Sequence, residues 1–181
     1  MHGAWRMYSG VSSSACPSER VPVVYRVAKK RHALYDVAGA VRVGGRWTSP
    51  GVRVIYAAEH YATAILEILV HRGRLALPGP HHAVRIAIPD DLAMEVLDPR
   101  AHAGWDTEGS SVARAAGDAW VAEGRTAVLI VPSVPGQPEE WNYILNPAHR
   151  DASRIRPQRP FDVVWDGRLF GPPTVPRPSG R

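Results

Sequence analysis

The chain has little of what several classes of protein require. Its 181 residues include one cysteine, Cys16, so no disulfide can form within the chain. No apolar run reaches the roughly 18 residues that a membrane-spanning helix needs. Residues 1–20 also lack the apolar segment of a secretory signal. Together these absences favour a cytoplasmic protein with no membrane segment.

Lysine is almost absent, because Lys29 and Lys30 are the only lysines among 22 basic residues. We interpret the excess of arginine mainly as a compositional bias of the source genome. The formal net charge of +5 lies at the ends, since residues 1–20 carry +1 and residues 150–181 carry +4, which leaves residues 21–149 neutral. A basic C-terminal segment can bind RNA or an acidic partner. The neutral body argues against a nucleic-acid channel.

The common nucleotide-binding and catalytic motifs are missing too. There is no G-x-x-x-x-G-K-[ST] loop and no G-x-G-x-x-G turn, so a nucleotide would have to be held in another way. No H-E-x-x-H motif or cysteine cluster is present, and the adjacent His81 and His82 suit a turn, so we predict no metal site. Ser133 is not in a G-x-S-x-G elbow, which excludes the usual hydrolase nucleophile.

What is present is typical of one folded domain. With 45% hydrophobic and 22% charged residues, the composition is that of a globular protein, and the length suits a single core. We expect a flexible leader at 1–20, the folded domain at 21–170 and a flexible Pro-rich tail at 171–181.

Hydrophobic periodicity predicts a strand-rich chain with two helices. Strands are predicted at 21–28, 39–45, 52–58, 82–89, 93–98, 126–133, 140–147 and 161–170, with 39–45 closing in a glycine turn and 140–147 at a sheet edge. Helices are predicted at 59–72, from its apolar stripe, and at 110–124, between a Ser110 cap and a Gly124 stop. This irregular order favours an α+β domain over a regular βαβ winding.

Glu67 has the most apolar neighbours of any acid in the sequence. Within the helix predicted at 59–72, it shares a face with the small or polar residues His60, Thr63, Ala64 and His71. Such a face leaves room for a ligand beside the carboxylate. The alternative is a carboxylate on the solvent side of the helix, paired with His71.

Two arginines stand where a charge needs a partner. Arg26 lies in an apolar strand and faces either water or a ligand. Arg46 follows Gly44 and Gly45, whose missing Cβ atoms allow close approach of a ligand, and its guanidinium can hold a phosphate or pyrophosphate by two bonds. A glycine pair before an ordinary turn is the alternative for Arg46.

Three more residues are candidates for the same site. Trp47 either stacks on a base or covers apolar surface. Tyr56 precedes the helix that carries Glu67, and it stands near that carboxylate or fills the core. The Ser133 hydroxyl either bonds a ligand or begins a turn.

Five segments, taken in order, resemble the RES-domain family, the toxin halves of bacterial RES–Xre toxin–antitoxin pairs. They are VYRVA, GAVRVGGRWTSPG, VIYAAEHYATAILEILVH, GDAWVAEGRTAVLIVPS and NYILNP, between Tyr25 and Pro147. The Arg, Glu and Ser of the family name fall on Arg26, Glu67 and Ser133, which the resemblance implies to be catalytic. It also implies that Arg46 and Tyr56 bind the substrate, and we add Trp47 as a weaker candidate.

The resemblance implies an ADP-ribosyltransferase (diphtheria-toxin-like) fold and an enzyme that consumes NAD+ as a substrate, without a cofactor. As an NAD+ phosphorylase or glycohydrolase it would use phosphate or water as acceptor. The resemblance further implies a hetero-oligomer with a cognate Xre-type antitoxin, through which alone the toxin would meet nucleic acid. Three alternatives stay open: a protein ADP-ribosyltransferase using the same cleft, an RNA-binding or ribonuclease toxin using the basic tail, and a binding module without activity.

Overall fold

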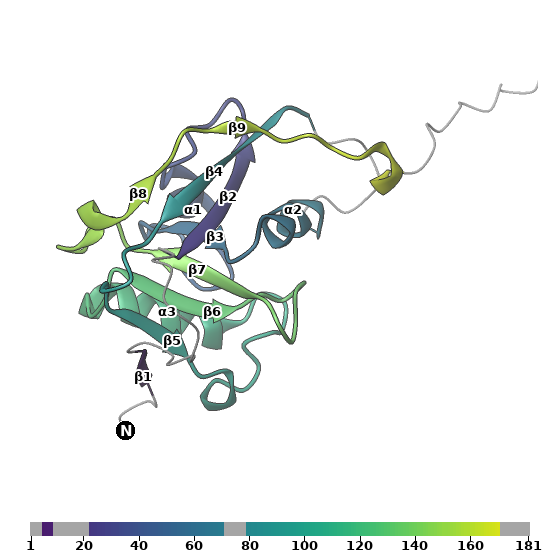
Figure 1. The fold of residues 1–181 in the computed structure, drawn as a ribbon. Coiled ribbons are helices and arrows are strands. Elements are labelled where there is room, and N and C mark those ends of the chain that lie inside the picture. The colour runs from purple at the N-terminus through teal and green to yellow at the C-terminus, as the bar shows by residue number, and fades with distance from the viewer. Residues whose placement is uncertain (1–4, 9–21, 71–78, 171–181) are drawn as a thin grey trace, which may run out of the picture.

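The computed structural model describes residues 5–8, 22–70 and 79–170 (Figure 1). Most of the predicted leader, including Cys16, lies outside the described residues, as do His71 and the tail predicted at 171–181. Residues 5–8 of the leader form a strand that pairs with the folded domain. No helix in the described part of the chain has the length and apolarity to cross a membrane.

A mixed sheet of nine strands carries three α-helices among the described residues. The strands are β1 (Trp5–Tyr8), β2 (Val23–Lys29), β3 (Ile55–Ala58), β4 (His81–Ala87), β5 (Met94–Leu97), β6 (Val128–Pro132), β7 (Trp141–Leu145), β8 (Arg156–Pro157) and β9 (Phe161–Asp162). The helices are α1 (Ala38–Val43), α2 (Tyr61–Val70) and α3 (Ser111–Glu123), with 3₁₀ turns at Pro99–Ala101, Ala152–Arg154 and Gly167–Leu169. The strand order is β1-β5-β6-β7-β3-β2-β4-β8, with β9 beside β4. The predicted single α+β domain is confirmed.

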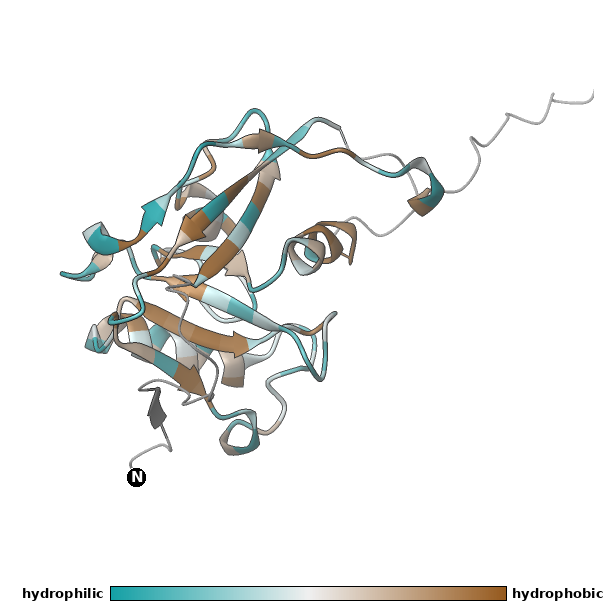
Figure 2. Cartoon of the chain, in the orientation of Figure 1, coloured by the Kyte–Doolittle hydropathy of each residue, from teal (hydrophilic) through white to brown (hydrophobic). Residues whose placement is uncertain are grey.

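Strand β6 lies at the centre of the core and is buried along its whole length. Successive side chains of a strand point to opposite faces of the sheet. Val128 and Ile130 therefore join one hydrophobic cluster, while Leu129 and Val131 join another that includes Trp120 of α3. Burial on both faces explains why this strand is a continuous apolar run, visible as a brown arrow in Figure 2.

Helix α3 connects β5 to β6, the one parallel pair among the described strands. The Ser110 hydroxyl accepts a hydrogen bond from the Ala113 amide at 3.1 Å, and Gly124 ends the helix with a φ of 59°. Trp120 is fully buried and donates to the Thr126 hydroxyl at 2.9 Å. The helix predicted at 110–124 is confirmed, together with both of its caps.

The strand predicted at 39–45 is wrong, because Ala38–Val43 forms the short helix α1. The alternation of Val41, Arg42 and Val43 imitates a strand, yet Arg42 and Val43 are both exposed. The Asp36 carboxylate accepts from the Ala38 amide at 3.0 Å, which favours a helical start.

Two predicted strands differ in their position or length. The strand predicted at the sheet edge, β7, lies between β6 and β3, so both of its edges are hydrogen-bonded. Its first three side chains are partly exposed like those of an edge strand, yet Trp141 and Tyr143 pack against the core and Asn142 lines a cavity. The strand predicted at 161–170 is limited to Phe161–Asp162, and the rest is loop and a 3₁₀ turn.

Candidate active site

A cavity of about 910 Å³ opens where β2 and β3 part. These two strands share one bridged pair, Tyr25 with Ala58, so their edges are not closed by a continuous ladder. The cavity is lined by β2 and β3, by α1 and the glycine turn after it, by α2, and by the segment 106–109. Its size lies at the upper end of the range for small-molecule sites. Helix α2 packs beside β2 and β3 (Figure 1). Its residues Ala64, Glu67, Ile68 and Val70 form one wall of the cavity.

The Glu67 carboxylate of α2 lines this cavity and is held from the sheet. Oε1 accepts a hydrogen bond from the Ser133 hydroxyl at 3.0 Å and another from the Asn142 side-chain amide at 2.6 Å. Ser133 follows β6 and Asn142 lies on β7, and these two strands pair with each other. Two donors on a rigid part of the sheet therefore orient one carboxylate oxygen.

Asn142 was not among the candidates from the sequence. It is the second residue of β7, between Trp141 and Tyr143, and it lines the cavity beside Glu67. A polar residue within an apolar strand was the available signal. Asn142 contacts Glu67 only because α2 packs on the sheet. The two residues are 75 positions apart, so the sequence does not show that they are neighbours.

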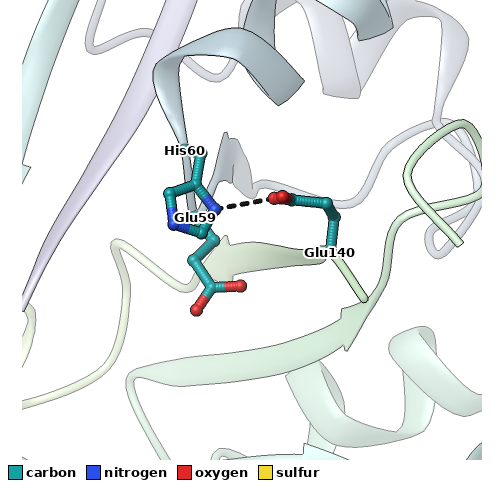
Figure 3. Close-up of side chains that lie close together, drawn as sticks. All are labelled: Glu59, His60 and Glu140. Atoms are coloured by element: carbon teal, nitrogen blue, oxygen red, sulfur yellow. Dashed lines mark hydrogen bonds and ion pairs between the residues drawn. The ribbon is translucent and has the colours of Figure 1, made fainter. Parts of the chain in front are cut away.

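A second polar contact anchors the beginning of α2. Glu140 accepts a hydrogen bond from the Thr63 hydroxyl at 2.7 Å. It accepts another from the His60 ring, also at 2.7 Å (Figure 3). These two bonds, first that of Thr63, hold the pKa of Glu140 below its usual value. His60, Thr63 and Glu67 lie on one face of α2, so the helix is fastened to the segment 133–142 at two levels.

The same region holds three side chains of the kinds that bind metals, two glutamates and one histidine. Single ligand atoms of Glu59, His60 and Glu140 lie within 4.8 Å of one another. However, the Glu140 oxygen is already bonded to His60 and Thr63, and exposed acidic groups of this kind are common without an ion. We assign the cluster to anchoring α2.

The Arg26 side chain bridges the opening between β2 and β3. Its Nε donates to the Leu34 carbonyl at 2.5 Å, Nη1 to the Tyr56 carbonyl at 2.8 Å and Nη2 to the Asp36 carbonyl at 3.3 Å. Burial lowers the pKa of Arg26, and the nearby Asp36 charge opposes this shift. The guanidinium thus joins one carbonyl of β3, that of Tyr56, to two carbonyls of the loop that follows β2.

Arg46 and Trp47 together hold the segment 105–107 as a wall of the cavity. Arg46 Nη1 donates to the Thr107 carbonyl at 2.7 Å and to the Trp105 carbonyl at 3.3 Å. The Trp47 side chain is 2% exposed and stacks on Trp105, with ring centroids 5.4 Å apart and planes 17° apart. Its ring belongs to the hydrophobic core that supports the cavity.

Gly44 and Gly45 perform different tasks beside Tyr56. Gly44 has a φ of 68°, a conformation that disfavours any side chain. A Cβ on Gly45 would lie 2.5 Å from the Tyr56 hydroxyl, which bonds the Thr48 hydroxyl at 2.8 Å. Burial raises the pKa of Tyr56 to about 12, so the phenol is neutral at physiological pH. The missing Cβ makes room for a fixed tyrosine rather than for a ligand.

Replacing Gly45 by alanine should therefore disturb the cavity. The new methyl would press on a Tyr56 ring that is hydrogen-bonded and nearly buried, so we expect a loss of about 1–3 kcal/mol in the free energy of unfolding. Denaturant titration measures this loss. Gly39→Ala is the control, because a Cβ at Gly39 meets nothing within 4 Å. Equal stability of the two variants would contradict the close packing of Tyr56 on Gly45.

The amino-acid sequence is similar to those of known toxins. The RES domain model matches residues 23–166. The chain is 40% identical over 137 residues to Prs ADP-ribosylating toxin of Sphingobium sp. (strain YBL2), a match covering 74% of this chain and 84% of that protein. It is 34% identical over 150 residues to Toxin Res of Pseudomonas putida, covering 82% of this chain and 99% of that protein.

A solved structure shares the fold. One chain of the crystal structure of the M. tuberculosis MbcT–MbcA toxin–antitoxin complex superposes with a TM-score of 0.62. The likeness covers 78% of this chain and 83% of that chain at 18% identity. At this identity the likeness shows a common architecture.

Proposed function

The chain belongs to the RES domain family of toxins, and we propose that it cleaves the nicotinamide–ribose bond of NAD+ with phosphate or water as acceptor. The observation that carries the proposal is the Glu67 carboxylate, held by Ser133 and Asn142 inside a cavity of about 910 Å³. A preorganised negative charge in such a cavity can stabilise positive charge that develops on a bound sugar.

The proposed chemistry needs little beyond this charge. When the bond from the ribose C1′ to the nicotinamide nitrogen breaks, the electron pair goes to the pyridinium ring and nicotinamide leaves neutral. No general acid is required. The ribose becomes oxocarbenium-like, and an oxygen of phosphate or water then forms the new bond to C1′, with the proton of an attacking water passing to the solvent. Glu67 would bond a ribose hydroxyl and offset the positive charge in the transition state.

The contacts of the other predicted residues support more specific roles. Ser133 is fully buried and its hydroxyl donates to Glu67, so we assign Ser133, with Asn142, to orienting the carboxylate. Arg26 joins β2 to the Tyr56 carbonyl of β3 and lines the cavity between these strands. The neutral Tyr56 phenol would pack against the sugar or nicotinamide, and Arg46 would offer its remaining N–H groups to a phosphate.

Transfer of ADP-ribose to a protein is the second candidate. It is favoured by one specific observation, since a relative 40% identical to this chain bears the name Prs ADP-ribosylating toxin. The same bond of NAD+ breaks in that reaction, and a nucleophilic side chain of the target replaces phosphate or water. Both reactions would use Glu67 in the same way.

We also propose an antitoxin partner of the Xre type. The support is the structural neighbour, which comes from a toxin–antitoxin complex. An enzyme that consumes NAD+ without restraint would harm the cell that makes it, so an inhibitory partner suits the proposed activity.

Product analysis tests the proposal. The purified protein is incubated with NAD+ in phosphate-free buffer, with phosphate, and with phosphate plus cell extract, and products are identified by mass spectrometry. We expect nicotinamide release without extract, giving ADP-ribose from water and ADP-ribose 1″-phosphate from phosphate. Nicotinamide release that requires extract, with mass added to a protein, would instead establish the transferase. No release under any condition would refute both.

A further inference from the structure

Arg114 of α3 lines the cavity, and neither the sequence nor the family resemblance identifies it as a site residue. It lies beside the glycine turn, where its Nε approaches the Gly45 carbonyl at 3.4 Å. This contact is long for a hydrogen bond. Within the described parts of the chain it is the only hydrogen bond found for Arg114, which forms no ion pair there.

The natural helical partner of Arg114 is occupied elsewhere. Asp118 lies four residues further along α3, a spacing that usually brings opposite charges together. In this structure the Asp118 carboxylate accepts from the Ser49 amide at 2.9 Å and so fastens the glycine turn to α3. Arg114 therefore keeps its guanidinium N–H groups for another partner.

Of the other two cavity arginines, Arg26 is bonded to the protein through all three nitrogens, whereas Arg46 is bonded through Nη1 alone. Arg26 donates to three main-chain carbonyls, and Arg46 donates through Nη1 to two. Two acids, Asp106 and Glu108, also line the cavity, but both are exposed and neither pairs with Arg114. A half-buried guanidinium without a carboxylate partner is suited to an anionic ligand, which it can hold by two parallel bonds.

We propose that Arg114 binds the pyrophosphate of the dinucleotide substrate, next to the turn formed by Gly44 and Gly45. This inference rests on the proposed function. It assigns the main anion contact to α3, with Arg46 as a neighbouring donor. Glu67 would then act on the ribose, so that one residue binds the pyrophosphate and another promotes cleavage of the glycosidic bond.

Calorimetric binding to variants in a Glu67→Gln background, which should prevent turnover, tests this assignment. Two ligands are compared: NAD+, and nicotinamide riboside, which lacks the pyrophosphate. Adding Arg114→Gln should weaken NAD+ binding by about tenfold to a hundredfold, the effect expected for losing charge-assisted hydrogen bonds. Binding of nicotinamide riboside should change by less than about threefold. Arg114→Lys, which keeps the charge but loses the fork, should give an intermediate loss for NAD+.

Arg53→Gln is the matched control, because Arg53 is exposed and lies outside the cavity lining. It should leave both affinities unchanged. Unchanged NAD+ binding by Arg114→Gln, or equal loss for both ligands, would overturn the assignment. If Arg114→Gln does not fold, the Arg114→Lys variant replaces it in the test. Unchanged NAD+ binding by Arg114→Lys would then overturn the assignment. Failure of the Glu67→Gln parent to bind NAD+ would instead count against the proposed function.

Discussion

Replacing Glu67 by glutamine is expected to lower the rate of NAD+ cleavage by a factor of about a hundred to a thousand or more. Glutamine keeps a side-chain carbonyl where Oε1 accepts from Ser133 and Asn142, so both hydrogen bonds and the position of α2 can persist. What disappears is the negative charge. The measurement is the initial rate of nicotinamide release under saturating NAD+.

The control for this variant is Glu139→Gln. Glu139 is an exposed acid outside the cavity lining, so its replacement removes one negative charge without affecting the site. Its rate should equal that of the parent protein, and both variants should unfold at similar temperatures. A Glu67→Gln protein with the parent rate would remove Glu67 from the mechanism.

The second large effect is expected from Gly117→Ala in α3. Alanine in place of a helical glycine normally stabilises a helix by about 1 kcal/mol. Here the added Cβ would overlap the main-chain carbonyl of Trp47, whose carbonyl carbon would lie at 2.8 Å. A main-chain group cannot rotate away as a side chain can, so α3 would have to move. We expect a net loss of about 3 kcal/mol or more.

Denaturant titration of Gly117→Ala and Gly39→Ala checks this prediction. Both glycines are helical, but a Cβ at Gly39 has open space. Gly39→Ala should therefore be neutral or slightly stabilising. A Gly117→Ala protein as stable as the parent would show that α3 does not pack closely on Trp47. Because α3 also carries Arg114, the same variant should weaken NAD+ binding.

Local patterns explain why much of the fold could be predicted. The apolar stripe of 59–72 and the caps of 110–124 are set by residues within a few positions of one another. The run 126–133 likewise predicts a buried strand from its continuous apolar residues alone. The stretch 39–45 imitates a strand because apolar and polar side chains alternate in it. The helix is favoured instead by the Asp36 contact at its start and by Gly44, which caps its end.

The candidate site was only partly accessible from the sequence. The resemblance assigned Glu67 and Ser133 to one site, and in the structure the Ser133 hydroxyl donates a hydrogen bond to Glu67. Asn142 and Arg114 were missed, because their position at the cavity depends on strand register and on how α3 packs. No local pattern distinguishes an asparagine beside Glu67 from one that faces solvent.

By itself the sequence determined the class of fold, the two long helices and the presence of Arg26, Arg46, Tyr56 and Glu67 among the candidates. Only the tertiary structure decided what each side chain contacts. The glycine pair illustrates the difference, since Gly45 is required by the Tyr56 hydroxyl, eleven residues away. The physical reason is that hydrophobic periodicity is local, whereas hydrogen-bond partners and close contacts depend on which segments pack together.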